Sequence, residues 1–321
     1  MKLFVTGAAG FIGSNYVRYV LDATDHEVTI YDALTYAGNL ASIRDVLDDR
    51  RCEFVHADIC DPDDVAAAMD GHDAVVHFAA ETHVDRSIHD GSQFVRTNCI
   101  GTNVLCDVAR TVGVGRFLHI STDEVYGSVE VGSSVETDPL EPRSPYSAAK
   151  AGSDLIALSY HSTHGLPVIV TRCANNYGPY QYPEKVIPLF TTNLLDGKKV
   201  PLYGDGMNVR DWIHVEDHNI AAHLVLEHGT PGEIYNIGAG NGLTNVDLTH
   251  RLLELTGRDE SFIQPVEDRL GHDRRYSVDI GKISTLGWSL SRSFDDSLAA
   301  TVDWYRDHRD WWEPLKARSG S

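Results

Sequence analysis

Tyr146 and Lys150 lie four residues apart, and a helix through them places both side chains on one face. Ser144 and Pro145, just before them, are typical of a helix start, with the serine as cap and the proline in the first turn. A neighbouring ammonium group stabilises a phenolate, so we expect Lys150 to lower the pKa of Tyr146 from its usual value of about 10. This pair could therefore take a proton from a hydroxyl group.

A second candidate cluster is Thr122-Asp123-Glu124, which directly follows the apolar stretch 117–121. Side chains at the carboxyl ends of parallel strands line the ligand crevice of such sheets. Two adjacent carboxylates in a partly dry cleft do not ionise equally, so one can act as a general acid and the other as a base. The alternative interpretation is a structural acid pair at the end of a strand.

A glycine-rich turn, with Gly7, Gly10 and Gly13, follows the apolar stretch 3–6 and opens a helical pattern over 11–21. Glycines in a turn between a strand and a helix permit close approach to a pyrophosphate, which the helix N-terminus attracts. The turn therefore predicts a dinucleotide site.

Asp32 ends the second predicted strand, where an acid accepts hydrogen bonds from a ribose and repels a 2′-phosphate, so NAD is favoured over NADP. Asp58 and Ile59 end the third, where an adenine would lie. An ordinary turn aspartate is the alternative for Asp32.

Short apolar strands alternating with helices must position these groups. The expected strands are 3–6, 27–31, 53–56, 74–78, 117–120, 168–171 and 234–237. This order predicts an α/β fold with a doubly wound parallel sheet of the Rossmann type and a smaller C-terminal substrate-binding lobe. We expect residues 1–172 plus about 207–240 to form the NAD-binding domain, and 173–206 plus about 241–321 to form the nucleotide-sugar-binding lobe.

Composition narrows the class of protein. The 321 residues carry a formal charge of −20, which argues against nucleic acid or an anionic membrane as the main partner. The five cysteines are scattered, and the sixteen histidines show no ligand spacing such as His-Glu-x-x-His, so we expect neither disulfides nor a metal site. The N-terminus lacks the layout of a signal peptide, which favours a cytoplasmic protein.

The chain resembles the extended short-chain dehydrogenase/reductase family nearly end to end, and within it most closely the dTDP-glucose 4,6-dehydratases. The segments that carry the resemblance are 6–15, 34–39, 79–87, 121–127, 175–181, 210–212 and 271–273. The Thr122-Asp123-Glu124 triplet is the most specific, because related epimerases and decarboxylases usually lack the aspartate.

The resemblance implies a lyase reaction with internal recycling of NAD. Tyr146 would take the proton of the sugar 4-hydroxyl as hydride leaves C4, Lys150 would hold the nicotinamide ribose, and Thr122 would bind the 4-oxygen. Glu124 would remove the C5 proton, and Asp123 would protonate the departing 6-hydroxyl. Return of hydride to C6 would give a 4-keto-6-deoxy sugar, as in deoxysugar biosynthesis.

The resemblance also implies binding residues. Beside Tyr146, Lys150 and the three glycines, the expected NAD contacts are Phe11, Ile12, Asp32, Thr35, Asp58, Ile59, Ala79, Ala80, Thr97 and Asn176. Beside Thr122, the expected nucleotide-sugar contacts are Thr82, Asn175, Lys185, Val186, Pro201, Tyr203, Arg210, Asn245, Arg269 and His272. A homodimer through helices around 94–110 and 146–164 is implied as well.

Two features depart from the family pattern. Leu270 replaces a usual proline, and the interval between Gly127 and Tyr146 is short, which predicts a trimmed loop. A nucleotide-sugar 4-epimerase or decarboxylase on the same fold remains the main alternative, because such enzymes share the glycine turn and the Tyr146/Lys150 pair. A non-catalytic NAD-binding protein is the alternative from another class.

Overall fold

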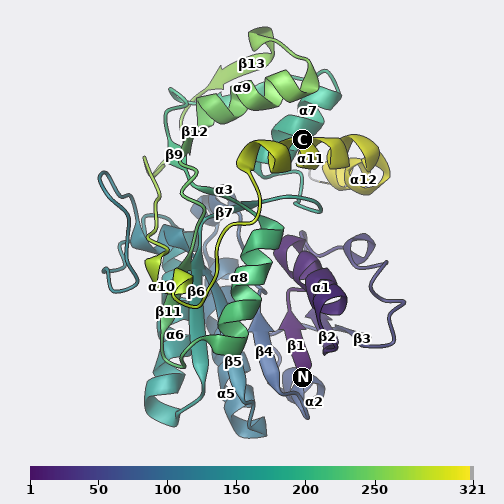
Figure 1. Cartoon of the computed structure of the whole chain (residues 1–321), viewed down its shortest axis with the longest axis vertical. Coiled ribbons are helices and arrows are strands. Elements are labelled where there is room, and N and C mark those ends of the chain that lie inside the picture. The colour runs from purple at the N-terminus through teal and green to yellow at the C-terminus, as the bar shows by residue number, and fades with distance from the viewer. Residues whose placement is uncertain (319–321) are drawn as a thin grey trace.

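Seven parallel strands form the central sheet in the computed structural model, which describes residues 1–318 (Figure 1). Their spatial order is β11-β6-β5-β4-β1-β2-β3, which confirms the predicted doubly wound Rossmann sheet. Their bounds are β1 Lys2–Thr6, β2 Glu27–Asp32, β3 Cys52–His56, β4 Ala74–His77, β5 Arg116–Thr122, β6 Val168–Cys173 and β11 Ile234–Ile237. Strands β4 and β6 are buried along their whole length because helices cover both faces.

Helices pack on the two faces of this sheet around separate apolar cores. One face is covered by α1 (Phe11–Ala23) and α8 (Val215–His228), whose Val17, Val20 and Val225 join its core. The other face is covered by α2 (Pro62–Met69), α5 (Thr102–Val112) and α6 (Pro145–His164). The part of the molecule built on this sheet also contains three short helices, α3 (Val84–His89), α4 (Ser92–Phe94) and α10 (Gly281–Ser284).

Helix α6 begins where the sequence predicts. The Ser144 hydroxyl accepts the Ser147 backbone N–H at 3.1 Å, and the Ser147 hydroxyl accepts the Ser144 N–H at 3.1 Å. This reciprocal capping box satisfies two backbone donors that would otherwise lack partners. It fixes the first turn of the helix that carries Tyr146.

The chain leaves the sheet after β6, builds much of a smaller lobe, and returns through α8 to β11 (Figure 1). The helices of the lobe are α7 Val186–Leu195, α9 Asn245–Thr256, α11 Phe294–Asp307 and α12 Arg309–Arg318. Its short strand pairs are β7 Asn175–Tyr177 with β10 Trp212–His214, β9 Val209–Arg210 with β12 Leu243–Thr244, and β8 Val200–Tyr203 with β13 Ile263–Val266.

We propose the predicted two-part division with one change, which moves residues 280–290 from the lobe to the NAD-binding part. Ile283 and Trp288 lie in the core between α1, α8 and the sheet, so residues 280–290 belong with the NAD-binding part. No helix within residues 1–318 is long and apolar enough to cross a membrane.

The loop before α6 is tied down. Val129 N–H donates to the Arg275 carbonyl at 2.9 Å, and Ser134 N–H donates to the Ser277 carbonyl at 2.9 Å. The short segment between Gly127 and Tyr146 is thus held by hydrogen bonds to the backbone of residues 275–277, which follow Gly271. Leu270 itself is 80% exposed, so its side chain adds little packing to that segment.

Candidate active site

The glycine turn after β1 is shaped by close backbone contacts. Gly7 has a φ of +67°, and a Cβ there would lie 2.5 Å from the backbone nitrogen of Ala79. A Cβ on Gly13 would lie 2.5 Å from the Gly7 carbonyl oxygen. Gly10 caps α1 without a side chain, which leaves the first-turn N–H groups for an anion.

Asp32, at the end of β2, connects this turn to the sheet. Its carboxylate accepts the Ala9 N–H at 2.9 Å on one oxygen and the Leu34 N–H at 2.8 Å on the other. Each carboxylate oxygen can accept a second hydrogen bond, so the group can still receive ribose hydroxyls. Burial raises the pKa of Asp32, against the lowering effect of these two N–H groups.

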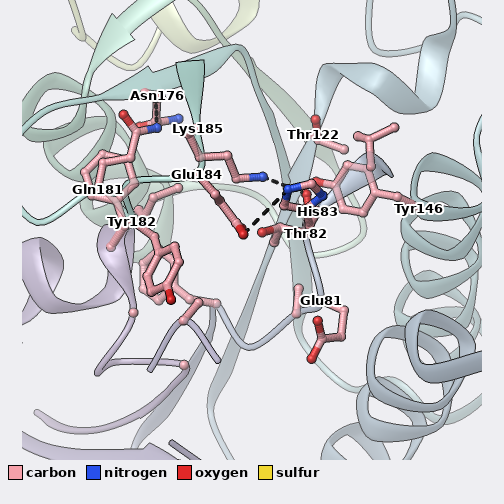
Figure 2. A pocket seen from close by; sticks show the side chains of 18 of the residues that line it. Glu81, Thr82, His83, Thr122, Tyr146, Asn176, Gln181, Tyr182, Glu184 and Lys185 are labelled. Atoms are coloured by element: carbon pink, nitrogen blue, oxygen red, sulfur yellow. Dashed lines mark hydrogen bonds and ion pairs between the residues drawn. The ribbon is translucent and has the colours of Figure 1, made fainter. Parts of the chain in front are cut away.

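The catalytic candidates converge from β5 and α6. Thr122 ends β5, and Asp123 and Glu124 begin a short 3₁₀ turn, Asp123–Tyr126. The Thr122 hydroxyl accepts the Glu124 N–H at 3.3 Å and donates to the Asp123 carboxylate at 3.3 Å. Tyr146 lies in the first turn of α6, facing the same cleft (Figure 2).

The two adjacent carboxylates differ in their surroundings. Burial raises the pKa of Asp123 far above its usual value, and the negative charge of Glu124 raises it further. Burial also raises the pKa of Glu124, but Arg210, Arg269 and Lys185 oppose that rise. The cations therefore favour ionised Glu124 beside protonated Asp123, the unequal ionisation expected from the sequence.

The expected effect of Lys150 on Tyr146 is wrong. The Lys150 ammonium donates to the Ile120 carbonyl at 2.8 Å, which orients it toward β5. Burial and the charge of Glu124 raise the pKa of Tyr146 well above its ordinary value, and the Thr122 hydroxyl only partly offsets them. Helical spacing indicates that two side chains share a face, but it does not reveal the cost of burying a phenolate.

Cationic side chains lie on the lobe side of the cleft. The Lys185 ammonium donates to the Thr82 carbonyl at 2.8 Å, and burial lowers its pKa. Arg210 donates to the Asp273 carbonyl at 2.9 Å and stacks 4.2 Å above the Tyr276 ring. Arg269 pairs with Asp85 at 3.5 Å. These groups give an acidic protein a local site for an anion.

All of the predicted site residues line one cleft of about 480 Å³ between the sheet and the lobe. The predicted cofactor residues there are Gly7, Gly10, Phe11, Ile12, Gly13, Asp32, Thr35, Asp58, Ile59, Ala79, Ala80, Thr97, Tyr146, Lys150 and Asn176. The other predicted residues there are Thr82, Thr122, Asp123, Glu124, Asn175, Lys185, Val186, Pro201, Tyr203, Arg210, Asn245, Arg269 and His272.

Among the polar residues that line this cleft, Glu81, His83 and Glu184 were not predicted from the sequence. Glu184 and Lys185 point toward Thr82 and His83 (Figure 2), and the Glu184 carboxylate lies 3.5 Å from His83 Nε2. Burial lowers the pKa of His83 to about 4, so this imidazole is neutral near pH 7. The acid–base neighbours Glu184-Lys185 are the only sequence signal, and such pairs are common on surfaces.

Known proteins resemble this chain over nearly its whole length. The profile described as GDP-mannose 4,6 dehydratase matches residues 4–301. A dTDP-glucose 4,6-dehydratase of Streptomyces antibioticus is 58% identical, covering 99% of this chain and 96% of that protein. A relative from Salmonella typhimurium with the same name is 45% identical over 99% of this chain and 96% of its own length.

A solved structure agrees with these sequence matches. The dTDP-glucose 4,6-dehydratase DesIV from Streptomyces venezuelae, with NAD and TYD bound, superposes with a TM-score of 0.97 at 57% identity, covering 98% of this chain and all of that one. The chain therefore belongs to the nucleotide-sugar 4,6-dehydratase family, among the dTDP-glucose 4,6-dehydratases, and the resemblance found in the sequence is confirmed.

Proposed function

We propose that this protein is an NAD-dependent dTDP-glucose 4,6-dehydratase, a hydro-lyase that forms dTDP-4-keto-6-deoxyglucose. The observation that carries the proposal is the pair of unequal carboxylates, Asp123 and Glu124, beside Tyr146 at the carboxyl end of β5. An acid and a base at one place suit removal of water. The names of the close relatives supply the substrate.

The residues present fit NAD. Gly7 and Gly13 leave a cradle that a Cβ would fill, and the first turn of α1 offers N–H groups to a pyrophosphate. Asp32 offers its carboxylate to the adenosine ribose and would repel a 2′-phosphate. When bound, NAD supplies the hydride acceptor and donor, and its oxidised ring adds positive charge that favours a phenolate.

The protein side chains then handle the protons. Tyr146 takes the proton of the 4-hydroxyl, and Thr122 holds the same oxygen through its hydroxyl. Lys150, whose buried ammonium donates to the Ile120 carbonyl, would hold the nicotinamide ribose. The C4 ketone acidifies the neighbouring C5–H, which the ionised Glu124 removes, while the protonated Asp123 gives its proton to the 6-hydroxyl as water leaves.

Lys185, Arg210 and Arg269 hold the diphosphate of the substrate. Arg210 is buried, and its backbone contacts with Val209 and Asp273 fix the plane of its guanidinium. A fixed guanidinium suits bidentate recognition of phosphate oxygens. Asn175, Val186, Pro201, Tyr203, Asn245 and His272 would contact the rest of the nucleotide-sugar.

A UDP-glucose 4-epimerase from Thermus thermophilus shares the fold, with a TM-score of 0.89 at 31% identity. Epimerisation needs no acid beside the 6-hydroxyl, so a buried, protonated Asp123 favours the dehydratase. Incubation with dTDP-, UDP- and GDP-sugars, followed by mass analysis, tests the proposal. We expect dTDP-glucose to lose one water; turnover of another sugar without that loss would contradict it.

We also propose a homodimer. Val95 and Ile100, in the helix that precedes α5, are each 52% exposed, and Leu155 on α6 is 60% exposed. Apolar side chains on adjacent exposed helices suit an isologous contact. We further propose that the enzyme works in the cytoplasm, because its five cysteines are all free, as a reducing compartment keeps them.

A further inference from the structure

Three potential metal ligands meet at the amino ends of the strands, on the opposite edge of the sheet from the catalytic cleft. His26 precedes β2, and His223 and Glu227 lie one turn apart near the end of α8. The Glu227 carboxylate lies 3.8 Å from His223 Nε2 and 4.0 Å from His26 Nε2. All three donor atoms lie within 4.8 Å of one another.

Both imidazoles present an unused nitrogen to this place. The Nε2 atoms of His26 and His223 are buried, and neither makes a hydrogen bond. The His223 side chain is 5% exposed, so its Nε2 is costly to leave without a partner.

The remaining ring nitrogens are already held. His223 Nδ1 lies 2.9 Å from the hydroxyl of the buried Tyr16, and His26 Nδ1 lies 3.1 Å from the Met1 amino group. While that amino group is an ammonium, it donates to His26 Nδ1, so coordination through His26 Nε2 releases one proton from the Met1–His26 pair. An Nδ1–H that donates to Tyr16 leaves the lone pair of His223 on Nε2. This is the outer-shell contact that orients metal-binding histidines in proteins.

Space for a further ligand adjoins the group. A cavity of about 230 Å³ is lined by Tyr19, His223, Leu224, Glu227, Trp288 and Ser289. Glu227 is 39% exposed, so it can turn toward either histidine without disturbing the core. The cavity can hold the water that completes a coordination shell of three protein ligands.

We propose that His26, His223 and Glu227 form a binding site for a divalent transition-metal ion, best suited to Zn²⁺. Two imidazoles and one carboxylate suit Zn²⁺, whereas Mg²⁺ and Ca²⁺ prefer oxygen ligands alone. Bonds of about 2.1 Å in tetrahedral geometry require donor atoms about 3.4 Å apart, so the three donor atoms must move closer together by roughly 0.4–1.4 Å.

The ion would join the start of the sheet to α8 and stabilise this edge. The spacing of ligands in the sequence did not reveal the site, because only His223 and Glu227 are close along the chain. The expectation of no metal site rested on that local spacing.

Cobalt(II) is the probe for the ligand set. The untagged, NAD-loaded protein is treated with chelator, exchanged into clean buffer and titrated with Co²⁺. We expect the intense visible absorption of four-coordinate Co²⁺, saturating at one equivalent, and its replacement by added Zn²⁺. Glu227→Gln and His26→Gln should lose this absorption, while their NAD content stays unchanged.

His228→Gln is the matched control. His228 lies 3.9 Å from the other oxygen of Glu227 but is 61% exposed and outside the group of three. The proposal requires that this variant keep the absorption. Loss in His228→Gln, retention in Glu227→Gln, or no such absorption in the unchanged protein would each overturn it.

A stability measurement adds an independent readout. Zn²⁺ should raise the Tm of the unchanged protein and of His228→Gln, but not that of Glu227→Gln. Tyr16→Phe should keep the site but weaken its affinity by about 10–100-fold, as expected for loss of an outer-shell partner. Equal Zn²⁺ shifts in the unchanged protein and Glu227→Gln would contradict the assignment.

Discussion

Asp123 and Glu124 are adjacent in sequence but have opposite tasks in the proposed reaction. Asp123→Asn cannot protonate the 6-hydroxyl, and Glu124→Gln cannot accept the C5 proton. Each variant should dehydrate dTDP-glucose about 10²–10⁴-fold more slowly, because a positioned acid or base typically contributes that much. Oxidation at C4 needs neither carboxylate, so reduced nicotinamide should accumulate and be measured by its near-ultraviolet absorbance.

Tyr146→Phe is the control for that experiment. It lacks the group that takes the 4-hydroxyl proton, so neither the absorbance nor product should appear. Dehydration at the unchanged rate in both carboxylate variants would make the acid pair structural. Failure of both variants to reduce the nicotinamide would assign the pair to oxidation or binding.

The raised pKa values of the two carboxylates also predict the pH dependence of kcat. Glu124 acts ionised, so the rate should rise as the pH increases through its raised pKa, above the usual glutamate value of about 4.3. Asp123 acts protonated, so the rate should fall at higher pH, as Asp123 ionises. Steady-state profiles measure both limbs. In Asp123→Asn the fall of kcat at high pH should shift or disappear. If that fall were unchanged, a group other than Asp123 would cause it.

Among the elements, α6 depends on its N-terminal cap. Ser144→Ala removes the side-chain acceptor of the capping box and should lower the free energy of unfolding by about 0.5–2 kcal/mol. Urea denaturation measures the change. Ser162→Ala, in the last turns of the same helix, is the control, because Ser162 bonds only the Leu158 carbonyl and should cost less. If both variants lost the same free energy of unfolding, the capping box would stabilise α6 no more than an ordinary side-chain hydrogen bond.

The sequence was most informative about elements whose signal is local. The strand-turn-helix around Gly7–Gly13 and the Ser144-Pro145 helix start were both predictable, because chain neighbours define them. The π-helix Val95–Gly101 was not, although it places Thr97 in the cleft and Asn98 against the Glu81 backbone at 2.9 Å. One extra residue per turn leaves no periodic pattern that differs clearly from an α-helix.

Features that depend on distant segments were harder to predict. Glu184 meets His83, and His26 meets His223, only because separate strands and loops end at the same place. The pKa of Tyr146 was predicted in the wrong direction because burial by the surrounding elements outweighs its spacing from Lys150. Tertiary burial thus decides the chemistry of groups whose positions are predictable.

At the scale of the whole molecule, the proposed dimer rests on exposed apolar residues of two adjacent helices. Leu155→Glu places a charge on that surface and should convert dimers to monomers, as measured by light scattering after size exclusion. Val131→Glu is the control, because Val131 is 90% exposed in the loop before α6 and lies outside this surface. A dimer that survives Leu155→Glu, or dissociates equally in Val131→Glu, would contradict the proposed interface.

The return of the chain to β11 bears on how the protein emerges from the ribosome. Strand β6 is complete at residue 173, but its outer neighbour ends only at residue 237, after α8. At synthesis rates of about 5–20 residues per second, the edge of β6 stays open for roughly 3–13 s. During that interval the nascent sheet also lacks Val225 and Leu226, which close its core. An open, apolar strand edge invites pairing with other chains, so the nascent chain is exposed to such pairing until α8 and β11 have been made.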